Sequence, residues 1–211
     1  MGTSAVYRIH TGDDVVAVHA MARRLLDRRS TGCCRAYVAV DVEVDTHRDL
    51  ARYLTLGSAY LVVTLPAELV EQATPVLGPH LSAADRWKTS RDGSLPLMID
   101  FDGAVVTALR RLPPLECRIS TYECELEDDP AGSLLSAVGS DPASVLWRVC
   151  WPGEHKYAGF ELGLNGIELY HRDPPPGHSL YLHVRSNGEE LAQALATTVG
   201  AGAVGDAALG R

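Results

Sequence analysis

The stretch from Tyr157 to Arg185 constrains the fold most, because it holds three alternating apolar runs separated by turn-forming residues. Asn165-Gly166 stands between the first two runs. Asn-Gly favours a two-residue type I′ turn, since both turn positions need positive φ. This turn fixes the register of a hairpin in which Glu161 lies opposite Tyr170. The sequence therefore predicts an antiparallel hairpin, followed by a third strand over Ser179–Arg185.

The first half of the chain alternates between helical and strand patterns. Thr11 resembles the N-cap of a helix that runs to about Arg29, and Thr46 resembles the N-cap of a second helix that Gly57 ends. Strands are predicted over residues 7–10, 35–44 and 59–65. The last is a continuous apolar run, which predicts a central strand covered on both faces.

A second hairpin is predicted over residues 97–109, because Asp102-Gly103 separates two apolar runs. Further elements are a strand over 117–127, a helix over 130–139 and a strand over 145–151. A capping box, Ser186 to Glu189, predicts a final helix that ends near Val199.

The residues Met98 to Gly103 also resemble the first motif of haloacid-dehalogenase-like phosphatases, an apolar strand followed by Asp-x-Asp. The resemblance implies a nucleophile at Asp100 and a general acid at Asp102. This chain departs from that pattern, because Ala104 replaces the usual threonine and no Asp-Asp metal motif follows at a suitable distance. We therefore predict a type I′ turn at Asp102-Gly103.

The pattern as a whole predicts an α+β fold: a mixed or antiparallel sheet with helices packed on one face, and an antiparallel-rich C-terminal half. With 211 residues, 46% of them hydrophobic, the chain can form one core. We predict a single domain over residues 1–200. The alternative is two lobes, about 1–85 and 95–200, divided near the polar segment that holds Trp87. Residues 201–211 are predicted to be a flexible tail.

Composition limits the partners and the compartment. The net charge of −8 disfavours binding to a phosphate backbone, so no nucleic-acid partner is expected. No apolar run approaches a membrane span, and the N-terminus lacks an export signal, which predicts a cytoplasmic protein. The five cysteines are odd in number, lack a Cys-x-x-Cys motif, and are predicted to be reduced thiols. The composition, rich in Ala, Gly, Arg and Asp, resembles a bacterial coding sequence.

The late strands carry an unusual polar face, and it forms the candidate site. Its members are Glu161, Glu168, Tyr170, Tyr181, His183 and Arg185. It could be a solvent-exposed sheet face or the lining of a cleft. In a cleft, His183 and Glu161 would be the catalytic acid and base, and the tyrosines, Arg185 and Glu168 would bind and polarise the substrate.

We therefore predict a small enzyme that transfers protons on a small organic molecule, such as an isomerase, lyase or cyclase of a biosynthetic pathway. Glycine-rich nucleotide-binding motifs are absent from the sequence, so no nucleotide cofactor is expected. The late histidines are not predicted to converge on a metal.

The alternative is a non-catalytic protein of the immunity or adaptor type that binds a protein partner. Its acidic faces would be Asp41, Glu43 and Asp45, and Glu123, Glu125 and Glu127. A homodimer is compatible with either reading.

Overall fold

The structure is a computed structural model. It describes residues 4–31, 35–81, 95–154, 158–170, 173–185 and 188–209. Contacts divide the chain into two units, and each is assembled from separated segments. Unit 1 comprises Met1–Ala39, Glu123–Asp129 and Pro142–Arg211, whereas unit 2 comprises Val40–Tyr122 and Pro130–Asp141.

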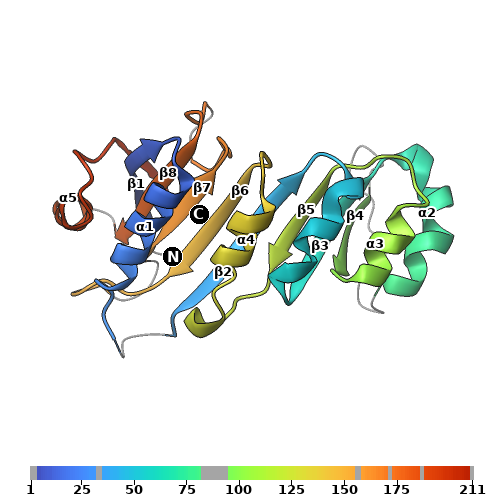
Figure 1. Ribbon diagram of the computed structural model, residues 1–211, viewed down its shortest axis with the longest axis horizontal. Helices are drawn as coiled ribbons and strands as arrows, with labels where there is room; N and C mark the ends of the chain where they lie inside the picture. The colour runs from blue at the N-terminus through green and yellow to red at the C-terminus, as the bar shows by residue number, and fades with distance from the viewer. Residues whose placement is uncertain are drawn as a thin grey trace. The chain divides into compact units, whose positions relative to one another are not determined.

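Unit 1 is a sheet with helices packed against it (Figure 1). Its strands, in spatial order, are β6 (Ala143–Arg148), β7 (Gly159–Leu164), β8 (His178–Arg185), β1 (Ser4–Gly12) and β9 (Ala207–Leu209). The described pairings among them are antiparallel. Helices α1 (Val15–Leu26) and α5 (Glu189–Thr198) pack on the strands, and the 3₁₀ turn η4 spans Leu126–Asp128.

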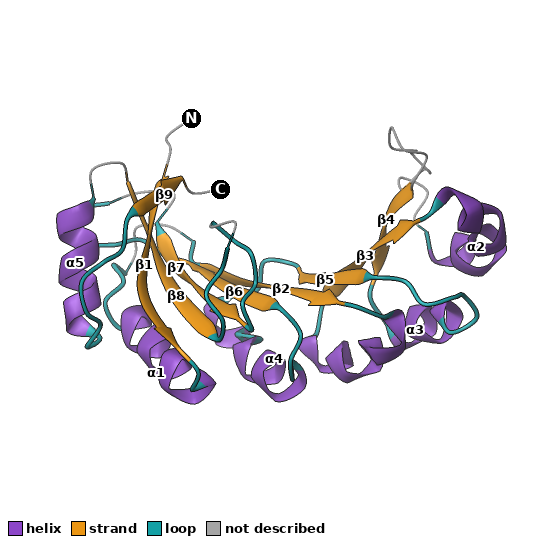
Figure 2. Ribbon diagram, turned by 90° about the horizontal axis from the view of Figure 1, so that it is seen from above, coloured by secondary structure: helices purple, strands orange, loops and turns teal. Residues whose placement is uncertain are grey.

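Unit 2 has the strand order β4 (Leu95–Asp100), β3 (Ala59–Leu65), β5 (Cys117–Thr121) and β2 (Tyr37–Val44, of which the part from Val40 belongs to this unit). Its helical segments are η1 (His47–Leu56), η2 (Ala67–Leu69), α2 (Val70–Leu77), η3 (Gly78–His80), α3 (Gly103–Leu109) and α4 (Ala131–Ala137). Figure 2 shows α3 on one side of this sheet, near β3 and β4. The opposite face of these strands carries no helix among the described residues.

The α+β class with helices on one face is confirmed, and several elements lie where the sequence predicts them. Alternate valines of β2, from Val38 to Val44, are buried. Thr46 caps η1 and Gly57 ends it, although this segment is a 3₁₀ helix. The prediction that β3 is covered on both faces is wrong, because Tyr60 and Val62 are half-buried and Thr64 is exposed. Among the described residues, no helix is long and apolar enough to cross a membrane.

Both predicted hairpins are wrong. Asn165 and Gly166 do form a turn with positive φ (54° and 70°), but β7 pairs with β8 and not with the residues that follow the turn. Asp102 does not form a hairpin turn: its carboxylate caps α3 by accepting from the Val105 N–H at 2.8 Å. Thr11 lies in β1, and Asp14 is the N-cap of α1.

Other predictions agree with the structure only in part. Cys150 is disulfide-bonded, so the prediction of reduced thiols is wrong for this residue. The predicted tail contains β9, which pairs with Ala5–Tyr7. The strand predicted to reach residue 127 ends at Thr121. Predictions for Cys33, Cys34 and the segment around Trp87 lie outside the described residues. The final helix begins at Glu189 with Gly188 as its N-cap, so the predicted capping box that starts at Ser186 is wrong.

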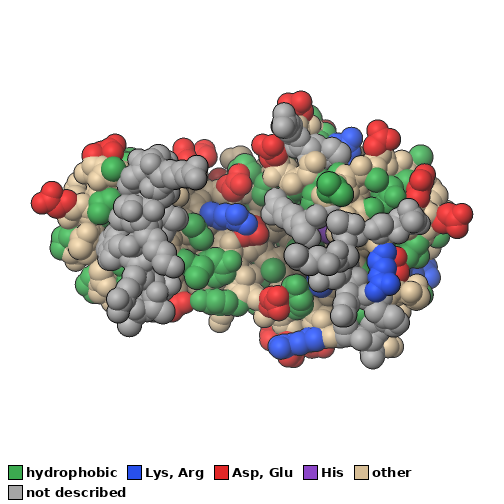
Figure 3. Space-filling model, turned by 180° about the vertical axis from the view of Figure 1, so that it is seen from behind, with side chains coloured by type: hydrophobic (Ala, Val, Ile, Leu, Met, Phe, Trp, Pro, Cys, Tyr) green, Lys and Arg blue, Asp and Glu red, His purple; other side chains and the backbone are tan. Residues whose placement is uncertain are grey.

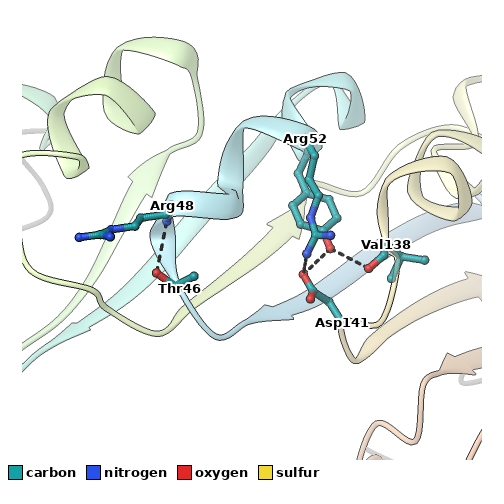
Figure 4. A network of polar contacts seen from close by, with 6 residues as sticks. Thr46, Arg48, Arg52, Val138 and Asp141 are labelled. Carbon is teal, nitrogen blue, oxygen red and sulfur yellow. Dashed lines mark hydrogen bonds and ion pairs between the residues drawn. The ribbon is translucent and has the colours of Figure 1, made fainter.

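A polar network joins η1 to α4 in unit 2 (Figure 4). The Tyr53 hydroxyl donates to Asp141 Oδ2 at 2.7 Å, and Arg52 forms an ion pair with the same carboxylate. Burial, followed by the Asp141 contact, raises the pKa of Tyr53, so this side chain remains a neutral donor.

We expect Tyr53→Phe to lower the free energy of unfolding by about 1.5–3 kcal/mol, because a buried hydrogen bond to a charged acceptor is lost. Urea denaturation measures the change. Tyr60→Phe, at a half-buried position on the face of β3 without a described helix, is the matched control, with an expected change within about 0.5 kcal/mol. Equal effects of the two substitutions would contradict the role assigned to the network.

Candidate functional site

The pairing of β7 with β8 places three candidate residues on one face of unit 1. The Phe160 and Trp147 rings stack with their centroids 4.9 Å apart, and Trp147 stacks on His19 of α1. Phe160 and the β7 side chains on its side of the sheet therefore face this helix. The Glu161 side chain lies on the other face of the sheet, and Glu161 pairs with Tyr181 of β8. Because side chains of a strand alternate between faces, His183 shares the face of Tyr181 and is a diagonal neighbour of Glu161.

Tyr170 reaches the same face from the segment that connects β7 to β8. This segment leaves the sheet at the Asn165-Gly166 turn and returns at Gly177, whose carbonyl accepts from the Gly166 N–H at 2.8 Å. Gly163 gives the segment room, because a Cβ there would lie 3.2 Å from Ile167. The returning chain thus packs on the sheet instead of extending it.

The side chains of Glu161, Tyr170 and His183 form a closed triangle, which we call the polar cluster. The Tyr170 hydroxyl donates to Glu161 Oε2. His183 Nε2 lies 3.2 Å from the same oxygen and 3.1 Å from the Tyr170 hydroxyl. Glu161 and His183 are 4% and 2% exposed, whereas Tyr170 is half-buried, so the cluster is accessible mainly at Tyr170.

Glu161 is held as a carboxylate. Burial, the largest single influence, raises its pKa, but the hydrogen bond and charge of His183 and the hydrogen bonds from Tyr170 and Ser144 together lower the pKa below its usual value. Hydrogen bonds that favour the charged form act in this direction. The three donors surround the buried charge that the fold would otherwise leave unsatisfied.

Tyr181 completes this face. Its ring meets the Tyr170 ring edge-on at 5.4 Å. Burial is the main cause of its raised pKa, and it outweighs the opposing effects of Ser179 and Arg8. Tyr181 therefore remains a phenol, which is able to donate a hydrogen bond.

The other two predicted site residues, Glu168 and Arg185, are not members of the polar cluster. Glu168 is exposed, and no hydrogen bond or ion pair described for this chain joins it to Glu161 or His183. Arg185 is exposed at the end of β8, and its backbone N–H donates to the Glu154 carboxylate at 3.2 Å. Ser144 of β6 was missed, because a serine in an apolar strand gives no signal of its partner in the sequence.

The polar cluster has the composition of a proton-transfer site. A buried carboxylate beside an imidazole fixes the orientation of the ring and stabilises its protonated form. Phenol groups beside them can stabilise negative charge on a substrate oxygen. Within the part of the chain that the structure describes, no group of His, Cys, Asp and Glu is arranged to hold a metal ion.

Comparison of the chain with protein-family models, with curated proteins and with solved structures found no match.

Proposed function

We propose that this protein is an enzyme that transfers protons on a small organic molecule at the polar cluster. The observation that supports it is the convergence of Glu161, Tyr170 and His183 within 3.2 Å of one another on one face of unit 1. Two sheet residues and one residue of a connecting segment meet there, and the hydrogen bond between an imidazole and a carboxylate is the arrangement of a catalytic base and the group that orients it.

The lowered pKa of Glu161 changes the roles that the sequence alone predicted. A strongly ionised carboxylate is a weak base, so His183 is the better proton acceptor. Glu161 then orients the ring through Nε2 and stabilises the imidazolium. His183 Nδ1 would take the proton of an acidic C–H bond and return it to the product, while Tyr181 donates to the enolate oxygen.

Exchange of substrate protons with solvent tests this proposal across several classes of compound at once. The protein is incubated in D₂O with a panel of 2-oxo acids, aldoses, ketoses and acyl thioesters, and deuterium incorporation is followed by NMR. We expect protein-dependent exchange into at least one compound. His183→Gln and Glu161→Gln should each slow it at least about 100-fold.

Glu190→Gln on α5 is the matched control, because it removes an exposed carboxylate of the same unit. It should retain the wild-type exchange rate. Folded His183→Gln protein that exchanges as fast as the control, or a panel without any protein-dependent exchange, would contradict the proposal.

A second candidate function is binding of a protein partner through an acidic sheet face. It is favoured by unit 2, where Asp41 and Glu43 lie on the strand face that carries no described helix. The second predicted acidic face has a different structure, because Glu123, Glu125 and Glu127 do not belong to a strand. Glu125 also lies 3.2 Å from Arg35, which offsets its charge.

A further inference from the structure

A broad, open groove of about 1040 Å³ lies in unit 2, where β2 and β3 end and β5 begins. Four exposed carboxylates line it, and they come from separate segments: Glu43, Asp45, Glu68 and Glu116. Apolar residues also line it, among them Val62, Pro66 and Pro114. The groove therefore combines acidic and apolar lining residues.

The positive charge at the groove is already compensated. Arg118 is the guanidinium among its described lining residues, and it lies 2.9 Å from Asp41. This hydrogen bond is the largest cause of the raised pKa of Arg118. Burial and the neighbouring Glu116 raise the pKa of the Cys117 thiol to about 12, so this lining residue stays neutral. Among the described lining residues, the four carboxylates thus leave a net negative charge.

Hydrophobic surface continues from the groove across the sheet face that carries no described helix. Val62 lies opposite Met98 of β4, and Met98 is 48% exposed. Tyr122, also 48% exposed, packs against Tyr60 with ring centroids 5.3 Å apart. Figure 3 views the molecule from the side turned away from α3, and it shows hydrophobic and acidic side chains next to one another. Exposed Met and Tyr beside charged groups are typical of protein-binding surfaces.

The geometry points to this groove and the adjoining Val62–Met98 surface as the docking site for a lysine- or arginine-rich segment of a partner protein. The inference deepens the second candidate function and rests on it. Cationic head groups would meet the carboxylates, while their aliphatic stems and neighbouring apolar side chains cover Val62 and Met98. A nucleic acid does not suit the same surface, because its phosphates would meet four carboxylates.

Fluorescence anisotropy with a labelled decapeptide that alternates lysine and leucine tests the docking site. The full-length protein should bind it, and a peptide that alternates glutamate and leucine should not bind. The triple variant Glu43→Lys, Glu68→Lys and Glu116→Lys should weaken binding at least about tenfold. Val62→Ser should weaken it about threefold, because apolar contact is lost while charge is unchanged.

The matched control is the triple variant Glu189→Lys, Glu190→Lys and Asp206→Lys, which changes the net charge equally at exposed positions of unit 1. It should lower affinity less than threefold. If both triple variants lose the same affinity for the peptide, the docking site is wrong and the peptide binds acidic surface in general. Absence of wild-type binding would remove the partner-binding function as well. If spermine displaces the labelled peptide at equal concentration, the groove is a site for small polycations and not for a partner protein.

Discussion

Replacing Gly159 with alanine is expected to lower the free energy of unfolding by about 2–6 kcal/mol. Gly159 begins β7 with φ at 149°, a conformation that side chains rarely allow, and a Cβ there would lie 2.2 Å from the Trp147 carbonyl oxygen. The obstacle is backbone, so it cannot rotate away. Relief of the clash would separate β7 from β6, the strand pair that supports Glu161.

Gly132→Ala in α4 is the matched control for Gly159→Ala. No atom lies within 4 Å of the added Cβ, and alanine favours a helix, so this change should stabilise the protein by up to about 1 kcal/mol. Urea denaturation should therefore show a lower free energy of unfolding for Gly159→Ala and a higher one for Gly132→Ala. A loss below about 1 kcal/mol for Gly159→Ala would contradict the close approach of β6 and β7.

Removing the Glu161 carboxylate is expected to have the second large effect. Glu161→Ala should lower the free energy of unfolding by about 3–5 kcal/mol, because the hydrogen-bond donors His183, Tyr170 and Ser144 lose their common acceptor. Glu161→Gln keeps hydrogen-bonding atoms in place and should cost less than Glu161→Ala. Glu190→Ala, at an exposed position, should stay within about 0.5 kcal/mol.

The same carboxylate predicts a dependence of stability on pH. Its pKa is lower in the folded than in the unfolded state, so its stabilising contribution is complete above the unfolded value of about 4.3. The contribution is lost as the pH falls through the lower, folded value. Glu161→Gln should therefore flatten the acid limb of the stability curve, measured by urea denaturation at several pH values. An unchanged acid limb would show that Glu161 is not held ionised by its neighbours.

The sequence predicts the fold class and most elements because their signals are local. The valine alternation of β2 and the Thr46 and Gly57 boundaries of η1 depend on residues within one element. Local signals also exist at Asn165-Gly166 and Asp102-Gly103, and there they mislead. A turn signal specifies a backbone conformation, but it does not specify which strand follows.

Tertiary pairing explains both wrong hairpins. After Asn165-Gly166, the chain reaches β8, which pairs with β7 on one side and with β1 on the other. Its residues from Ser179 to Val184 are buried. After Asp102, Val105, Val106 and Leu109 have helical spacing and are buried. The Asp side chain therefore serves as an N-cap, a role that sequence alone does not separate from a turn.

The candidate site combines one predictable feature with one that was not predictable. Tyr181 and His183 share a face because strand residues two apart always do, and this parity follows from the sequence. Tyr170 was expected opposite Glu161 in a hairpin. It does meet Glu161, but from a connecting segment that folds over the sheet. Packing of this kind depends on the small Gly163 below it, which no periodic pattern reveals.

The most direct test of the polar cluster is a ¹³C NMR titration of the glutamate side-chain carboxyl groups, with Glu161→Gln used to assign the Glu161 signal. We predict a pKa for Glu161 below the usual glutamate value of about 4.3, since His183, Tyr170 and Ser144 donate to its carboxylate. A Glu161 pKa above that value would mean that burial outweighs these donors. That result would contradict an ionised carboxylate that orients His183, and with it the proposed proton-transfer site.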